Sequence, residues 1–233
     1  MANTPTPVTL HIWGVTPAHV PGAIMAMAVD RPSVRRIPGL SFAKLLGTGS
    51  GRTFTASDAD VHHWAMLGVW TSAEDLRNFE GSPLHRRWLR RSCEQLRVEL
   101  EPLASTGRWA GRQPFDVAAA SPSDGPVAAL TRARLKPRLA RSFWAAVPPV
   151  VQALHGSAGL VLSLGIGEAP IGLQGTFSIW RSADDLATFA YRNPDHRRVI
   201  KQTKSTGWYA EELFARFTVR SVSGTYRGEP VVL

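Results

Sequence analysis

One histidine stands where a helix would present it for chemistry. The segment 193–196 reads Asn-Pro-Asp-His, and asparagine as a cap followed by proline is typical of a helix start. One face of this helix is expected to carry, at helical spacing, His196, Val199, Ile200 and Thr203. Two interpretations stay open at this point. His196 is either a core histidine bonded to backbone, or an imidazole ligand to iron or another metal.

A second histidine, His85, occupies the corresponding place in an earlier segment. Trp88 and Leu89 follow it three and four residues later, on the same helical face. Trp88 is large where Val199 is small, so we expect the indole to fill the space that the second segment leaves open. His85 is therefore interpreted as structural.

Polar side chains alternate along one predicted strand. One face is expected to carry Gln174, Thr176, Ser178 and Trp180, while Phe177 and Ile179 take the other. Arg132 interrupts another strand that is otherwise apolar. Buried polar groups need partners, so these positions either lie at exposed edges and bond to loops, or line a ligand cavity.

Other arrangements of reactive residues are weak. His62 and His63 are consecutive on a strand and point to opposite faces, so they cannot chelate one ion. Gly47–Gly51 lacks the Lys-Ser/Thr and helix that a phosphate loop requires. Cys93 is the only cysteine, which excludes an intrachain disulfide and any site built from several cysteines.

The elements that position these residues occur twice. Residues 70–87 (WTSAEDLRNFEGSPLHRR) match residues 180–198 (WRSADDLATFAYRNPDHRR), with the tryptophans 110 positions apart (180 − 70) and one residue inserted later. Two more pairs follow the same order: LGTG at 46–49 with LGIG at 164–167, and GRWAG at 107–111 with GTYRG at 224–228. Three collinear matches indicate a duplication.

Each repeat is expected to fold as strand, helix, two strands, helix, strand. The strands expected in the first half are Val8–Val15, Leu40–Gly47, Val61–Trp70 and Arg97–Arg108, and those in the second half are Val127–Leu135, Leu160–Gly165, Leu173–Trp180 and Tyr209–Arg220. The helices expected between them are Pro17–Asp30, 72–79, one from Ser82-Pro83, 139–154, Ser182–Tyr191 and Pro194–Thr206. Pro148-Pro149 should kink or interrupt the fourth of these helices.

This order predicts an α+β fold of two ferredoxin-like (βαββαβ) halves. The N-terminal half would span residues 8–117, a linker 118–126, and the C-terminal half 127–222. Two such halves can pack sheet to sheet as a pseudo-dimer and enclose a cavity between the sheets.

Composition limits the class of protein. The hydrophobic share of 44% suits a folded chain of 233 residues, no stretch approaches the length of a membrane helix, and the N-terminus is unlike a signal peptide. A cytoplasmic location is therefore expected. The net charge of +9 is spread over helix faces without a nucleic-acid module, which favours an anionic cofactor group, an acidic electron-transfer protein or a membrane surface over nucleic acid.

Several segments, in order and across nearly the whole chain, resemble the spheroidene monooxygenase family, whose enzymes oxygenate carotenoids in purple bacteria. The segments that carry this resemblance are Phe42–Gly49, Gly107–Phe115, Ala129–Ala133, Phe143-Trp144, Gly165–Pro170, Gln174–Trp180 and Gly207–Phe217. The resemblance implies a haem b protein of the dimeric α/β-barrel kind that uses dioxygen and an external electron donor. In related enzymes the proximal histidine comes from the C-terminal half, which favours His196 over His85.

The leading hypothesis is therefore a haem-dependent monooxygenase with a hydrophobic or specialised-metabolite substrate. His196 would bind the iron, and Arg132 and Lys44 would contact the distal pocket or the haem propionates. The remaining walls would come from Val199, Ile200, Gln174, Thr176, Ser178 and the tryptophans Trp64, Trp70 and Trp180. The basic helix could dock an acidic ferredoxin. Alternatives are other haem chemistry, namely peroxidation, dehydration or oxidation at nitrogen, and a protein that only carries haem or a hydrophobic ligand.

Overall fold

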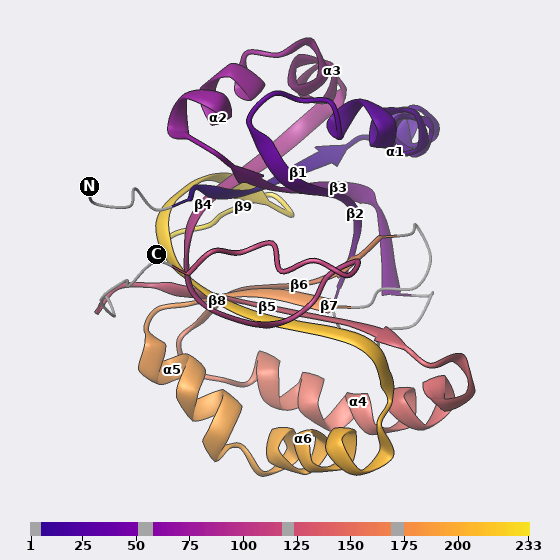
Figure 1. Cartoon of the computed structure of the whole chain (residues 1–233), viewed down its shortest axis with the longest axis vertical. Helices are drawn as coiled ribbons and strands as arrows, with labels where there is room; N and C mark the ends of the chain where they lie inside the picture. Colours follow the sequence, from indigo (N-terminus) through magenta and orange to yellow (C-terminus); the bar gives the residue numbers. More distant parts are fainter. Residues whose placement is uncertain (1–5, 51–57, 118–123, 169–174) are drawn as a thin grey trace.

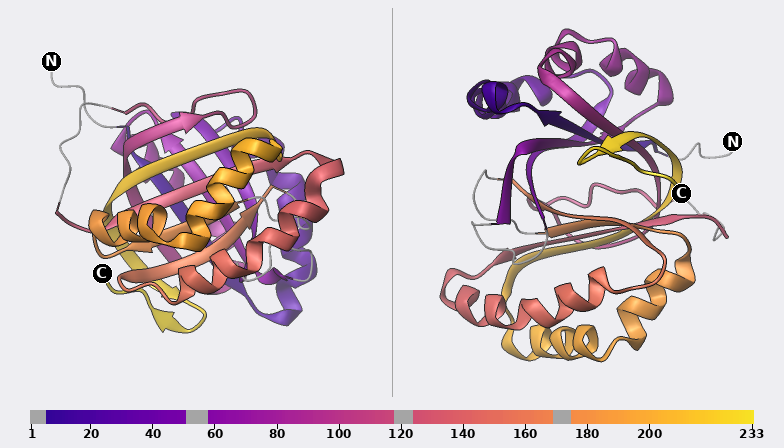
Figure 2. Two further views of the ribbon diagram at one scale, coloured as in Figure 1. Left: turned by 90° about the horizontal axis from the view of Figure 1, so that it is seen from below. Right: turned by 180° about the vertical axis from the view of Figure 1, so that it is seen from behind.

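The computed structural model describes residues 6–50, 58–117, 124–168 and 175–233. Strands lie in the middle of the molecule, and the helices of the two halves cover opposite sides of them (Figure 1, Figure 2). The elements of the first half are β1 (Val8–Val15), η1 (Pro17–His19), α1 (Val20–Val34), β2 (Leu40–Gly49), β3 (Ala59–Trp70), α2 (Ala73–Glu80), α3 (Pro83–Arg91) and β4 (Ser92–Gly107).

The second half repeats this order. Its elements are β5 (Val127–Leu135), η3 (Pro137–Leu139), α4 (Ala140–His155), β6 (Leu160–Gly167), β7 (Gly175–Trp180), α5 (Ala183–Ala187), η4 (Thr188–Arg192), α6 (Pro194–Thr206), β8 (Tyr209–Tyr226) and the short β9 (Glu229–Pro230). Within the described residues, no helix combines the length and apolar composition needed to cross a membrane.

All strand pairs are antiparallel, and both halves use the same strand order. The first half is ordered β4-β1-β3-β2, and the corresponding strands of the second half are ordered β8-β5-β7-β6. Strand β2 pairs with β6 through Gly47–Gly49 and Gly165–Gly167, and β4 pairs with β8 along most of its length. Each of the eight long strands therefore has a hydrogen-bonded neighbour on either side.

The space between the two halves of the sheet is filled by one shared apolar core. Strand alternation directs Leu10 and Ile12 of β1 and Leu67 of β3 into it, where they meet Phe177 of β7 and Phe217 of β8, among others. Among the described residues, large side chains from both halves occupy the space between the sheets, where the sequence predicted a cavity.

Two turns, one in each half, close this shared core. The backbone N–H groups of Ala110 and Gly111 donate to Glu211 of β8, at 3.0 and 2.8 Å. Reciprocally, Arg227 and Gly228 donate to Glu94 of β4, at 3.0 and 2.6 Å. The residues before the turns, Trp109 and Tyr226, are both buried in the shared core. Each half thus supplies the carboxylate that holds the other half's turn.

The helix-facing sides of the two halves differ. Beneath α1, α2 and α3 the first half packs a large aromatic cluster that includes Trp13, Trp64, Trp70 and Trp88. Beneath α4, α5 and α6, the buried cluster that the described residues of the second half form is smaller and consists of Val127, Leu154, Trp180 and Leu186. The second half therefore leaves room between sheet and helices.

Local signals in the sequence were mostly sound. Ser72 and Ser182 cap α2 and α5, each accepting a hydrogen bond from the backbone N–H three residues later, at 3.1 Å. Strand β8 runs well beyond its predicted end at Arg220. Helix α4 continues through Pro148-Pro149, so the prolines do not interrupt it. The prolines deprive the carbonyls of Trp144 and Ala145 of their helical donors, and both of these residues are exposed, so water can bind those carbonyls.

Candidate functional site

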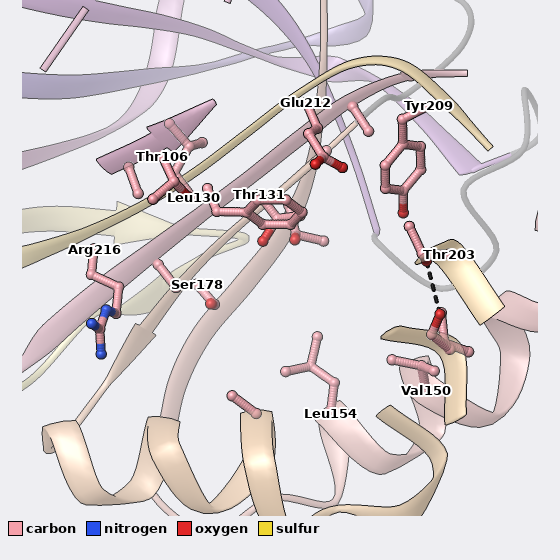
Figure 3. A pocket seen from close by; sticks show the side chains of 18 of the residues that line it. Thr106, Leu130, Thr131, Val150, Leu154, Ser178, Thr203, Tyr209, Glu212 and Arg216 are labelled. Carbon is pink, nitrogen blue, oxygen red and sulfur yellow. Dashed lines mark hydrogen bonds between the residues drawn. The ribbon is translucent and has the colours of Figure 1, made fainter. Parts of the chain in front are cut away.

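A cavity of about 910 Å³ lies between the second half of the sheet and its helices (Figure 3). Strands β5, β7 and β8 form its floor, and α4, η4 and α6 form its roof. Its volume falls within the range of about 300–1,000 Å³ that is typical of small-molecule and cofactor sites.

The floor carries the polar strand face expected from the sequence. Thr176, Ser178 and Trp180 of β7 line the cavity, while Phe177 and Ile179 point into the shared core, which confirms the predicted alternation. Thr131 of β5 lies directly opposite Thr176 and lines the cavity as well. The Ser178 hydroxyl oxygen accepts a hydrogen bond from Trp180 Nε1 at 3.0 Å. Hydroxyl groups thus run across an otherwise apolar floor.

The roof includes the predicted face of α6. Val199 and Thr203 line the cavity, at the spacing expected from the sequence, and Val150 and Leu154 of α4 line it beside them. His196 and Ile200 belong to α6, but their side chains lie outside the described residues, as does all of Gln174. The spacing of the described residues places one face of α6 on the cavity.

A polar group at one end of the cavity was not identified from the sequence. The Tyr209 hydroxyl is hydrogen-bonded to Thr203, whose own hydroxyl donates to the Val199 carbonyl at 2.8 Å (Figure 3). Burial, together with the nearby Glu212 carboxylate, raises the pKa of Tyr209 above its ordinary value. The phenol is therefore a neutral hydrogen-bonding group that ties β8 to the roof.

Arg216 is the cationic side chain at this cavity that sequence reasoning missed. It lies on β8, opposite Ala129 of β5 and Ala104 of β4, and lines the cavity (Figure 3). Among the described residues it has no ion-pair partner, so its guanidinium is free to bind an anionic group. The alternation of Glu212, Phe214 and Arg216 along β8 is the sequence feature that could have placed Arg216 on the cavity.

Arg132 and Lys44 require a correction, because neither lines this cavity. On β5, Arg132 shares the inward parity of Leu130, which is the face opposite to Thr131. Its guanidinium pairs with Glu211 and, at 2.7 Å, with Glu168. Lys44 Nζ reaches the other oxygen of Glu168, also at 2.7 Å.

The partners of Glu168 explain why this cluster is a closed ionic group. Burial alone would raise the pKa of Glu168, but hydrogen bonds from Lys44, Trp109 and Arg132 lower it. The Trp109 indole donates to Glu168 at 2.7 Å and lies beneath both cations, 5.7 Å from Lys44 Nζ and 5.6 Å from the Arg132 guanidinium. Both cations are thereby engaged at one end of the shared core.

In the first half, the equivalent space beneath the helices is occupied. The Trp88 indole is fully buried, stacks on Trp13 with ring centroids 4.9 Å apart, and donates to Asp30 at 3.1 Å. His85 is also buried, and its Nδ1 is bonded to the Glu80 carbonyl at 2.9 Å. Trp64 and Trp70 belong to this first-half core rather than to the cavity, which corrects the expectation that they wall it.

No group of three or more His, Cys, Asp or Glu side chains in the described part of the chain is placed to hold a metal ion. Two histidines of the first half, His11 and His63, have shifted pKa values. Burial and the neighbouring His85 and Arg97 lower the pKa of His11 well below its ordinary value, so His11 is a neutral core residue.

Comparison with known proteins identifies relatives of this chain. No family model matches the chain. It is 35% identical over 214 residues to a spheroidene monooxygenase of Rhodobacter capsulatus, covering 90% of this chain and 88% of the relative. It is also 35% identical over 191 residues to that of Rubrivivax gelatinosus, covering 82% and 73% of the two chains.

Solved structures share the fold. An aldoxime dehydratase matches with a TM-score of 0.57 at 14% identity, covering 94% of this chain and 83% of that one. Another aldoxime dehydratase, in complex with butyraldoxime, matches with a TM-score of 0.58 at 12% identity, covering 92% and 79%. The structural matches establish a common α+β architecture, and the sequence matches establish descent: this chain belongs to the spheroidene monooxygenase family.

Proposed function

We propose that this chain is a haem-dependent monooxygenase that acts on a hydrophobic substrate such as a carotenoid, with haem b bound in the cavity beneath α4 and α6. The observation that carries the proposal is that cavity. A face of α6 in helical register with His196 bounds it on one side, and a row of hydroxyl groups bounds it on the other. Membership of the spheroidene monooxygenase family supports the reaction type.

The described lining fits a haem group. Most of the walls are apolar, with Val150, Leu154 and Phe189 among them, as a porphyrin plane requires. Arg216 lacks an ion-pair partner among the described residues and is suited to bind a haem carboxylate. Arg132 and Lys44, which are held by carboxylates elsewhere, are then assigned to stability rather than to catalysis.

His196, which precedes Val199 by three positions and Thr203 by seven on α6, would hold the haem iron. When bound, haem b would activate dioxygen with electrons from an external donor. On the floor, Thr131, Thr176 and Ser178 provide hydroxyl groups for polar atoms inside the cavity. The apolar walls keep water out and accept a hydrophobic substrate.

The electron donor is proposed to be an acidic protein such as a ferredoxin. Arg197, Arg198 and Lys201 are exposed on α6, directly over the proposed haem site. A donor that docks there would be guided by charge, so its rate of electron delivery is expected to fall as ionic strength rises.

The architecture is inferred to be a tandem duplication of ferredoxin-like halves, that is, a dimeric α/β-barrel pseudo-dimer within one chain. The equal strand order of the halves and their reciprocal turns support this inference. On this view the first-half site was filled by Trp88 and the second-half site was kept for the cofactor.

The test is the absorption spectrum of the protein produced with adequate haem supply. We expect a Soret band that His196→Ala abolishes and His85→Ala retains, since His85 lies in the filled half. A protein without a Soret band would exclude haem dependence. Turnover with dioxygen and a reductant supports oxygenation, turnover with peroxide alone points to peroxidation, and haem binding without turnover indicates a carrier.

A further inference from the structure

Helix α1 is apolar on both of its faces. Its inner face packs Ala23 and Met27 into the first-half core. Its outer face carries an apolar ridge of exposed side chains, whose exposed fractions are 45%, 65% and 60% for Ile24, Met25 and Val29. A helix that is hydrophobic all round is ordinarily covered on all sides. The ridge is therefore suited to meet a second apolar phase.

The exposed charged side chains of α1 and α3 have a single sign. Asp30 is the only acid in α1, and it is buried, bonded to Arg87 of α3 at 2.8 Å and to Trp88 at 3.1 Å. These bonds hold α3 beside α1, and α3 contains four arginines and no acid, namely Arg86, Arg87, Arg90 and Arg91. Helix α2, with the acids Glu74 and Asp75, lies away from α1 (Figure 1).

We propose that α1 and α3 form a docking surface for an anionic phospholipid bilayer. The ridge of Ile24, Met25 and Val29 would enter the boundary between headgroups and acyl chains, and the exposed arginines of α3, Arg86 and Arg90, would contact lipid phosphates. An apolar ridge beside a basic helix has the composition of a surface that lies on an anionic membrane. The proposal does not depend on haem binding or on the reaction proposed above.

Charge also decides between this occupant and a second copy of the chain. In a two-fold contact through the ridge that pairs two antiparallel α1 helices, the α3 helices fall on the same side, so the arginines of one α3 would approach those of the other. This repulsion opposes self-association, whereas lipid phosphates attract the same arginines. The α6 surface differs, because its exposed described residues are polar, Arg197, Lys201 and Gln202 among them.

The experiment is flotation of the full chain with vesicles of phosphatidylglycerol, compared with vesicles of phosphatidylcholine. We expect binding to phosphatidylglycerol that is weakened by salt. Met25→Asp and Val29→Asp should each lower the partition coefficient by about 10-fold or more, because they place a charge on the ridge. Val232→Asp makes the same chemical change at a side chain that is 74% exposed outside the ridge, and should leave binding unchanged.

Folding of each variant is checked by circular dichroism and thermal unfolding. Because Met25 and Val29 are exposed, we expect both aspartate variants to remain folded. Arg86→Gln with Arg90→Gln should weaken binding to phosphatidylglycerol as well. Absence of binding to phosphatidylglycerol, or binding that Val29→Asp leaves intact, would overturn the proposal. A concentration-dependent dimer that Val29→Asp dissociates would overturn it in favour of a second copy.

Discussion

At the scale of single residues, the molecule uses its buried charges mainly to hold strands together. His63 is bonded through both ring nitrogens, to Asp60 at 2.9 Å and to Glu94 at 2.8 Å. Burial alone would lower the pKa of His63, but the two carboxylates raise it above its ordinary value of 6.5. Burial would raise the pKa of Asp60, yet the bond to His63 lowers it well below 3.8.

These shifts predict how stability depends on pH. The contribution of His63 is fully present below pH 6.5 and is lost as pH rises through its elevated pKa, because the folded state binds the proton more tightly. The contribution of Asp60 is present above pH 3.8 and is lost as pH falls further. We expect His63→Leu to cost about 2 kcal/mol at about pH 5.5 and clearly less at about pH 9. Urea unfolding at the two pH values measures this, and an equal cost at both would contradict it.

Some residues of the candidate site could be placed from the sequence, and others could not. Thr176, Ser178 and Val199 were found from periodicity alone, because a strand alternates and a helix turns in a fixed way. Arg132 was misplaced because an arginine on an apolar strand is equally compatible with a cavity and with a buried ion pair. The deciding partners, Glu168 and Glu211, lie far away in the chain.

At the scale of elements, both halves pack a glycine against the first turn of a helix, namely α2 in the first half and α5 in the second. Gly39 and Gly159 each precede a strand with a positive φ, of 71° and 78°. A Cβ atom added at either position would lie 2.0 Å from Asp75 Cγ or 2.2 Å from Asp185 Cγ, in the first turn of the helix that follows two strands later. The glycines allow these helix starts to pack directly on the connecting turn.

We therefore expect Gly159→Ala to destabilise the protein by about 2 kcal/mol, since it combines a left-handed backbone with a collision. Gly156→Ala is the matched control. That position has a φ of −86°, and its nearest neighbour to an added Cβ is 3.4 Å away, so the substitution should be close to neutral. Thermal unfolding compares the two variants, and equal stability of both would refute this account of Gly159.

Element boundaries were predictable where local chemistry sets them. The serine caps and the helix start at Pro194 are local signals, and α2, α5 and α6 begin where the sequence indicates. The extension of β8 beyond Arg220 was missed, because its partner at residues 221–224 is β4, which lies in the other half. A pairing between strands far apart in the sequence leaves no local sequence pattern from which it could be predicted.

At the scale of the whole molecule, the halves are interdependent. The shared core takes side chains from both, and Glu94 and Glu211 each hold the turn of the opposite half. The sequence predicted an α+β fold with antiparallel strands, which the structure has, yet it placed the cavity between the sheets. Phe177 and Phe217 instead pack in the shared core and fill the space between the sheets. Whether such a space is filled depends on how the side chains of both halves pack together, which the sequence pattern does not give.

We expect neither half to fold alone. Residues 1–117 and 118–233, expressed separately, would expose the shared core and aggregate, whereas their co-expression should give a soluble one-to-one complex. Size-exclusion chromatography and circular dichroism of the separate and combined halves measure this. A monomeric, cooperatively folded single half would show that the shared core is dispensable.

The pairing of all eight long strands on both sides has a consequence for how this protein meets others. Along their paired lengths these strands offer no unpaired backbone edge, so another chain can add a strand only where the pairing is incomplete, as along residues 40–46 of β2 and 160–164 of β6. At the fully paired strands, recognition is left to side chains, above all those on the outward faces of the helices. Specificity for partners can therefore change by surface substitution on α1, α3 or α6 without disturbing the strands beneath.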